Sequence, residues 1–122
     1  MILKLQKSQP APDICVIEFF GKLMMGNESR QVEWTVAEQL VAGVRRFIFD
    51  LSQLDGIDST GVGIIVMCEG KVRKAGGELR IAGPAGIVNE TLILTHVDRL
   101  LRFFPTTSEA TRDFSIAAKQ AG

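Results

Sequence analysis

The chain has 122 residues, of which 46% are hydrophobic and 23% charged, and its 14 basic and 14 acidic residues leave no net charge. This composition is that of one globular domain, expected over residues 1–122, and it argues against a nucleic-acid partner held by a basic surface. No apolar run approaches the roughly 20 residues of a membrane span, and residues 1–7 lack the apolar centre of a signal peptide.

Strand-like and helix-like segments follow one another along the chain. Strand patterns bounded by Gly, Pro and Asp predict strands at residues 2–7, 14–20, 45–51, 78–82 and 100–104. Helical spacing of apolar residues predicts helices at residues 28–42, 64–74, 85–94 and 108–119. Two prolines place a turn at residues 8–13, because proline does not fit inside a sheet, and so the first two strands form a hairpin. This order predicts an α/β fold: about four helices on a mixed sheet that is antiparallel at the N-terminal hairpin and parallel at its centre.

Large apolar side chains occur at two places where the pattern does not require them. Met24 and Met25 stand in a loop between glycines. We expect this loop to tuck under the core, with an adaptable contact surface as the alternative. Trp34 lies beside the apolar stripe of the helix at 28–42, and we expect it to pack in the core, with partner contact as the alternative.

Three polar residues, Asp58, Ser59 and Thr60, lie where the central strand passes into the next helix. Side chains there face the unpaired N–H groups and the positive end of the helix dipole. All three residue types are preferred helix caps, so capping is the simpler interpretation. A phosphate on Ser59 is compatible with it, because helix starts accept anions. Gly61 permits a close approach of the chain at the helix start.

The helix after Ser59 carries apolar side chains outside its core-facing stripe. Val62 and Val66 lie on one flank, together with Glu69 and Arg73. Either neighbouring elements cover this flank, or Val62 and Val66 form a partner-binding face beside Ser59.

The sequence offers little for catalysis, for a metal or for a cofactor. His96 is the only histidine, and it has no cysteine or carboxylate pair at ligand spacing. A triad of Ser59, His96 and Asp58 lacks the first glycine of a nucleophile elbow. Cys15 and Cys68 have no partner at motif spacing. We therefore expect no enzyme activity, no metal, no cofactor, and reduced thiols in a cytoplasmic protein.

The turn at residues 58–63, Asp-Ser-Thr-Gly-Val-Gly after an apolar strand, resembles the signature of STAS domains of the anti-sigma-factor antagonist type. The Gly-Lys-Leu at 21–23 is similar to the Gly-x-Leu of that family, and the Gly-Gly at 76–77 to its Gly-Gly before the fourth strand. The chain departs from the family at Met24 and Met25, where an acidic residue is common.

The resemblance implies a STAS fold and a non-enzymatic switch. Ser59 matches the phosphorylation site of the family, with Asp58, Thr60 and Gly61 around it. The implied kinase is an anti-sigma factor with a histidine-kinase-like ATPase fold, which binds the unphosphorylated form and releases the phosphorylated one, and a serine phosphatase resets the switch. Two alternatives remain: a self-associating scaffold subunit of a larger signalling assembly, and an accessory subunit of a lipid or small-ligand transport system.

Overall fold

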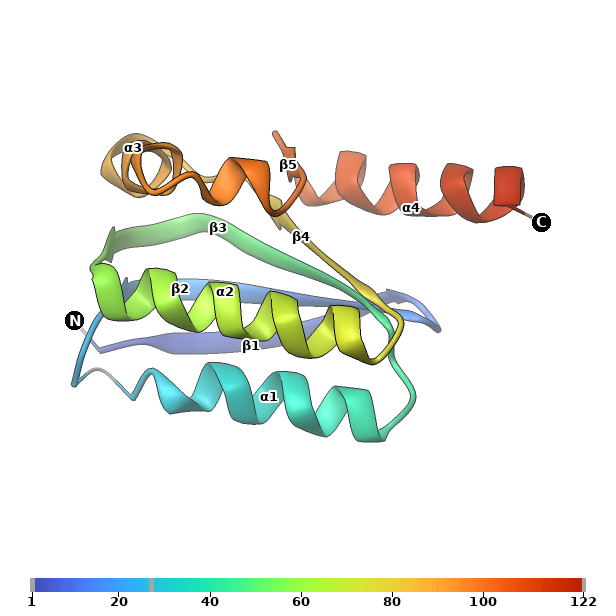
Figure 1. Cartoon of the computed structure of the whole chain (residues 1–122), viewed down its shortest axis with the longest axis horizontal. Coiled ribbons are helices and arrows are strands. Elements are labelled where there is room, and N and C mark those ends of the chain that lie inside the picture. The colour runs from blue at the N-terminus through green and yellow to red at the C-terminus, as the bar shows by residue number, and fades with distance from the viewer. Residues whose placement is uncertain (1, 27, 122) are drawn as a thin grey trace.

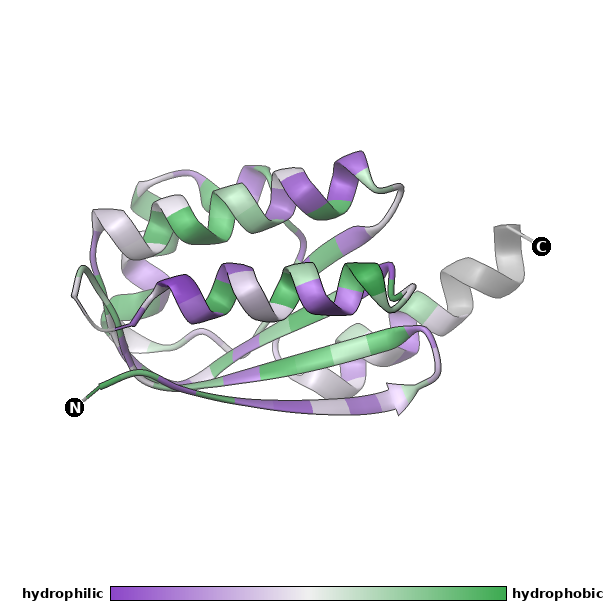
Figure 2. Ribbon diagram, turned by 90° about the horizontal axis from the view of Figure 1, so that it is seen from below, coloured by the Kyte–Doolittle hydropathy of each residue, from purple (hydrophilic) through white to green (hydrophobic). Residues whose placement is uncertain are grey.

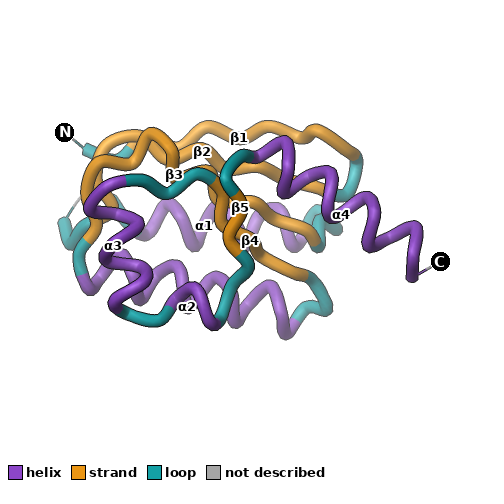
Figure 3. The backbone as a smooth tube through the Cα atoms, turned by 90° about the horizontal axis from the view of Figure 1, so that it is seen from above, coloured by secondary structure: helices purple, strands orange, loops and turns teal. Residues whose placement is uncertain are grey.

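The computed structural model describes residues 2–26 and 28–121, with side chains up to residue 115. Five strands form one sheet, helices α1, α2 and α3 cover one of its faces, and α4 lies against the other (Figures 1 and 3). In chain order the elements are β1 (Lys4–Ala11), β2 (Ile14–Leu23), α1 (Arg30–Val41), β3 (Arg46–Ile57), α2 (Ser59–Lys74), β4 (Glu78–Ala82), α3 (Gly86–Leu94), the 3-10 turn η1 (Val97–Arg99), β5 (Phe103–Phe104) and α4 (Thr107–Ala121).

The sheet has the predicted mixed topology. Its strand order is β1-β2-β3-β4-β5, with β1 antiparallel to β2 and every other neighbouring pair parallel. The parallel pairing of β2 with β3 runs from Ile14 opposite Arg46 to Leu23 opposite Ile57. The α/β class, the N-terminal hairpin and the parallel centre are therefore confirmed.

Two hydrophobic clusters lie on opposite faces of the sheet, because neighbouring strand residues point to opposite sides. The larger one joins the inner faces of α1, α2 and α3 to the strands, with Phe19 and Phe49 at its centre, ring centroids 4.9 Å apart. The smaller cluster lies under α4 and consists of Ile14, Val16, Ile48, Ala82, Ala110 and Phe114. Figure 2 shows the hydrophobic stretches of the strands beneath the helices.

Several predicted boundaries were wrong. β1 reaches Ala11 and contains Pro10, which is tolerated because β1 is an edge strand whose register shifts between Ser8 and Ala11. Both β2 and β3 continue beyond their predicted ends, so residues 21–23 and 52–57 are strand rather than loop. The helix predicted at 64–74 begins at Ser59, and the final strand contains only two residues. The strand predicted at 78–82 is confirmed.

The predicted positions of the large apolar side chains were also wrong in part. Trp34 is 70% exposed rather than packed in the core, because no described element covers the outer flank of α1. Met25 is 75% exposed and Met24 is half-buried, so the methionine loop lies on the surface instead of under the core. The core prediction is therefore wrong for Trp34 and Met25, and the contact-surface alternative stays a prediction.

A buried arginine fixes α4 to the sheet. Arg80 in β4 is 1% exposed, and its guanidinium lies 3.5 Å from the ring centroid of Phe114. It forms ion pairs with Glu78 at 2.7 Å and with Asp113 of α4 at 2.8 Å, and it donates to the carbonyl oxygen of Ala110 at 3.3 Å. A buried charge is tolerated only when it is paired in this way.

No helix among residues 2–26 and 28–121 is long and apolar enough to cross a membrane.

Candidate functional site

The candidate site is built at the junction of β3 and α2. β3 ends at Ile57, Asp58 has an extended backbone (φ −117°, ψ −174°), and α2 begins at Ser59. One carboxylate oxygen of Asp58, Oδ1, accepts the N–H of Gly61 at 2.9 Å. Asp58 is therefore the N-cap of α2, which satisfies one of the unpaired amides at the helix start. The capping interpretation is confirmed for Asp58, and it leaves Ser59 free for another role.

The second oxygen of the same carboxylate holds the methionine loop. Asp58 Oδ2 accepts the N–H of Met25 at 3.0 Å. The Asp58 N–H in turn donates to the carbonyl oxygen of Leu23 at 3.4 Å. One side chain thus connects the loop after β2 to the start of α2, a link that sequence spacing does not reveal because 33 residues separate the partners.

Asp58 remains ionised at neutral pH. Partial burial on its own raises the pKa of the Asp58 carboxyl, but the backbone N–H groups of Met25, Gly61, Thr60 and Asp58 together outweigh it and hold the pKa below its ordinary value. Hydrogen bonds donated to a carboxylate favour its charged form. The site therefore carries a fixed negative charge beside Ser59.

Gly61 lets the helix start approach the end of β2. A Cβ atom at this position would lie 2.2 Å from the carbonyl oxygen of Leu23 and 2.8 Å from Cγ1 of Ile57. Neither distance is possible for a real side chain, and the first contact is with backbone that cannot move aside. The sequence-based expectation for Gly61 is confirmed, and the close packing fixes the position of the first turn of α2.

The predicted site residues fall into exposed and half-buried groups. Ser59 is exposed, and none of the described residues hydrogen-bonds its hydroxyl, whereas Thr60 is half-buried. Val66 is 39% exposed, and Val62 is half-buried against the core, so the neighbouring elements cover the flank of α2 only in part. Ser59, Val62 and Val66 share this flank because they are three and seven residues apart in one helix.

Residues 7–110 match the STAS domain family. The chain belongs to this family. A curated protein of Thermotoga maritima, whose name marks it as a candidate anti-sigma factor antagonist, is 29% identical over 101 residues, which cover 83% of this chain and 89% of that protein. The STAS fold predicted from the turn at residues 58–63 is therefore confirmed.

Two solved structures have a similar fold. A Thermotoga maritima protein described as a candidate anti-sigma factor antagonist superposes with a TM-score of 0.79 at 25% identity, over 91% of this chain and 92% of that one. The Bacillus cell fate determinant SpoIIAA, solved in its phosphorylated form, superposes with a TM-score of 0.72 at 19% identity, over 91% and 99% of the two chains. The second likeness shows the fold alone.

Two charged residues at the edge of this STAS domain were missed from sequence. Lys22 near the end of β2 lies over Gly56, with its Cγ 3.1 Å from the place of an added Cβ atom, and its Nζ contacts Asp55 at 3.1 Å. The pairing of Lys22 with Gly56 across β2 and β3 produces this contact. The two charges are exposed by 40% and 62%, so they form a polar rim at the strand ends rather than a buried pair.

The residues considered for chemistry other than phosphorylation lie apart from the site. His96 is exposed in a left-handed conformation (φ 62°), and no hydrogen bond joins it to Ser59 or Asp58 in the described part of the chain. Among the same residues no three His, Cys, Asp or Glu side chains form a cluster that could hold a metal ion. Burial raises the pKa of Cys15, and burial, with Glu33 nearby, raises that of Cys68 to about 12, so neither thiol is reactive near pH 7.

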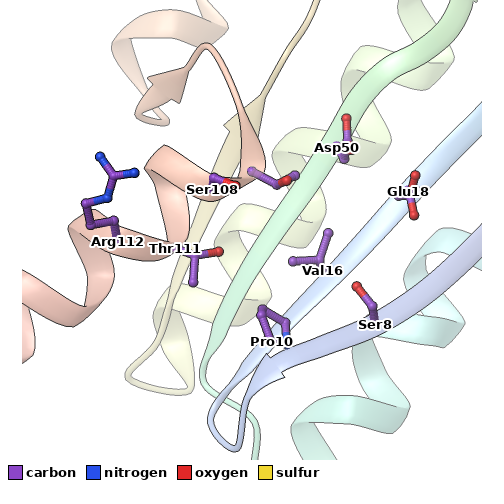
Figure 4. A pocket seen from close by; sticks show the side chains of 9 residues that line it. Ser8, Pro10, Val16, Glu18, Asp50, Ser108, Thr111 and Arg112 are labelled. Atoms are coloured by element: carbon purple, nitrogen blue, oxygen red, sulfur yellow. The ribbon is translucent and has the colours of Figure 1, made fainter.

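The domain has a groove on its other face. A cavity of about 460 Å³ opens between the sheet and the start of α4, with Glu18 and Asp50 on neighbouring strands (Figure 4). Arg112, at its rim, projects away from both carboxylates (Figure 4). An acidic wall of this kind repels phosphate groups, so the groove does not favour an anionic lipid as ligand. It lies on the α4 face and takes no part in the Ser59 site.

Proposed function

We propose that this STAS domain is an anti-sigma factor antagonist that works as a switch controlled by phosphorylation of Ser59. The observation that carries the proposal is the free, exposed hydroxyl of Ser59 at the start of α2, next to a carboxylate that is already engaged. SpoIIAA, which has the same fold, exists in a phosphorylated form. Similarity to a candidate anti-sigma factor antagonist supports the same class.

The unphosphorylated domain presents a compact apolar and polar surface to its partner. Exposed Met25 lies in the loop that Asp58 holds, exposed Val66 follows Ser59 by seven residues in α2, and half-buried Met24 and Val62 complete the surface. Methionine side chains adapt to the shape of a partner, and Asp58 fixes their loop through the Met25 amide. We infer that an anti-sigma factor serine kinase of histidine-kinase-like ATPase fold binds here.

The kinase step transfers the γ-phosphoryl group of ATP to Oγ of Ser59. A new O–P bond forms, the bond from the γ-phosphorus to the bridging oxygen breaks, ADP leaves and the hydroxyl proton is released to solvent. Phosphoserine carries a charge of about −1.5 to −2 at pH 7. A serine phosphatase then resets the domain by hydrolysing the ester.

The phosphate weakens binding at the interface rather than unfolding the domain. The helix dipole at the start of α2 tolerates the new charge. However, Asp58 already uses the Gly61 amide and remains ionised, so the phosphate stays unshielded and projects towards the partner. Burying such a charge without a counterion costs several kcal/mol, and each 1.4 kcal/mol is a factor of ten in affinity.

The test uses the kinase that binds the purified unphosphorylated protein. After incubation with ATP, mass spectrometry should find one phosphate, on Ser59. Ser59→Ala should take up no phosphate and keep the kinase bound, whereas Ser59→Asp should fold normally and bind at least tenfold more weakly. Thr60→Val is the matched control, because Thr60 is the adjacent hydroxyl and is half-buried, and it should still be phosphorylated. Phosphate mapped to Thr60, or none at all with a confirmed kinase partner, contradicts the proposal.

A further inference from the structure

The outer face of α1 carries an uncovered apolar stripe. Trp34 is 70% exposed and Val41 is 90% exposed, and the exposed Ala37 lies between them at helical spacing. With Glu38 these residues line a hollow of about 390 Å³. In Figure 2 the molecule is seen from below, from the side of α1, where hydrophobic and hydrophilic residues alternate on the helices. A large exposed aromatic residue beside a hollow is typical of a contact surface.

The two charges beside this stripe are at the wrong ends of the helix. Arg30 is the first residue of α1, where the helix dipole disfavours a cation, and Glu38 lies in the last turn, where it disfavours an anion. Both side chains are exposed, and neither forms an ion pair with another described residue. The isolated domain therefore leaves both charges uncompensated.

We propose that α1 pairs with α1 of a second copy, antiparallel, about a two-fold axis at Trp34. Arg30 and Glu38 are each four residues from Trp34, in opposite directions. In this arrangement Arg30 of each copy lies opposite Glu38 and the negative helix end of the other. The interface thus contains two equivalent Arg30–Glu38 pairs, one on each side of the two-fold axis, as expected for an isologous contact.

The same arrangement fills the hollow. Side chains of a helix lean towards its N-terminus, so the Trp34 indole lies towards its own Arg30. The C-terminal half of the second α1 lies opposite that position, and there Ala37 provides a small floor between Trp34 and Val41. Each indole therefore enters the hollow of the other copy, and tryptophan is a residue that carries binding energy at interfaces.

The contact is small and the dimer is correspondingly weak. A helix of 12 residues is about 18 Å long, and one helical stripe buries less than the roughly 800 Å² per partner of a standard interface. We expect dissociation in the micromolar range or above. The self-complementary placement of the two charges selects a second copy rather than an unrelated protein.

Sedimentation of the purified chain over increasing concentration is the first measurement. It should show a monomer–dimer equilibrium, and because Trp34 is the only tryptophan, its emission should shift to shorter wavelength as the dimer forms. Trp34→Ala should raise the dissociation constant of the dimer at least tenfold. Ile87→Ser, a change of an exposed apolar residue on α3, is the matched control and should leave it unchanged.

Charge reversal tests the antiparallel register itself. Arg30→Glu and Glu38→Arg should each weaken self-association, because like charges then lie opposite one another. The double variant should restore it, and a mixture of the two single variants should form a heterodimer, since each supplies the charge that the other lacks. A monomer at all concentrations up to about 1 mM, or single variants that fail to rescue each other, overturns the proposal.

The inference goes beyond the proposed switch and does not rest on it, because the α1 stripe contains no residue of the Ser59 site. All the α1 variants should be phosphorylated on Ser59 as the unmodified chain is. Absence of phosphate from the unmodified chain and from every variant, including Ile87→Ser, would count against the switch and not against the dimer.

Discussion

At the scale of single residues, the Asp58 carboxylate joins two segments of the chain and places a negative charge beside Ser59. Its two oxygens accept amides from Gly61 and Met25, which belong to different segments of the chain. The motif predicts the first bond, because Asp is a preferred N-cap. It cannot predict the second, because the position of the Met25 amide depends on where β2 ends. The methionines at 24 and 25, where the family commonly has an acidic residue, therefore change the side chains of the loop but keep its backbone link to the site.

Replacing Asp58 should separate these contributions. Asp58→Ala removes the cap and should lower the free energy of unfolding by about 0.5–2 kcal/mol. Asp58→Asn has one oxygen for two amides, so it should keep one hydrogen bond and cost less. Urea denaturation gives the free energies, and amide hydrogen exchange at Met25 and Gly61 shows which bond is lost. Equal exchange at both amides in all three proteins contradicts the shared carboxylate.

The pH dependence has a defined sign. The pKa of Asp58 is lower in the folded state than its ordinary value, so its stabilisation is present above the unfolded pKa of about 4 and is lost as pH falls through the folded pKa. The stability advantage of the unmodified chain over Asp58→Asn should therefore shrink below pH 4 and stay constant between pH 5 and 8. A difference that does not change with pH rules out the charge as its origin.

At the scale of elements, the start of α2 depends on one close contact. Gly61→Ala places a Cβ atom 2.2 Å from the Leu23 carbonyl oxygen, so it should destabilise the domain by roughly 1–3 kcal/mol or more. Gly63→Ala, two residues on in the same helix, meets nothing within 4 Å and should be neutral or stabilise by up to about 1 kcal/mol. Thermal and urea unfolding of the pair measure this. An Ala at 61 that is tolerated as well as one at 63 contradicts the packing of α2 against β2.

The central part of β3 was predicted well because both of its faces are buried. The run at 45–51 reads as a continuous apolar strand because β3 has neighbours on both edges there, β2 and β4. Beyond Asp50 the β4 pairing stops, and residues 52–57 include three exposed residues, so they do not have the pattern of a central strand. The prediction for Trp34 was wrong for a related reason. Helical spacing places Trp34 beside the apolar stripe, but only the fold shows that no described element covers that flank.

The site was predictable in part for the same physical reasons. Ser59, Asp58 and Gly61 could be placed from sequence because their roles depend on a local strand-to-helix junction. The contacts of Met25 and Lys22 depend on the register of β2 against β3, which no local pattern encodes. The exposure of Val66 depends on how far the neighbouring elements extend over α2, and this is a property of the whole fold.

At the scale of the whole molecule, the two faces of the sheet are held very differently. Three helices close the large cluster, whereas the smaller cluster is closed by α4 through Ala110, Phe114 and the ion pair of Arg80 with Asp113. Asp113 also contacts Arg102, at 3.0 Å, but that side chain is 58% exposed. An exposed pair contributes about 0–1 kcal/mol, while a buried arginine also fills space with its stem. Docking of α4 should therefore depend on Arg80 far more than on Arg102.

Three variants, ranked by their loss of stability, test this expectation. Arg80→Ala removes the stack on Phe114 and leaves a cavity. Glu78 and Asp113 are 46% and 34% exposed and can rehydrate, so the cost should be roughly 2–3 kcal/mol, below the 3–5 of a fully buried pair. Arg80→Met keeps the apolar stem and should lie nearer the unmodified chain, and Arg102→Ala should cost at most about 1 kcal/mol. Urea unfolding ranks the three, and hydrogen exchange of the α4 amides should rise first in Arg80→Ala. If Arg102→Ala releases α4 as strongly as Arg80→Ala, the surface pair holds the helix, and the buried stack on Phe114 is not its anchor.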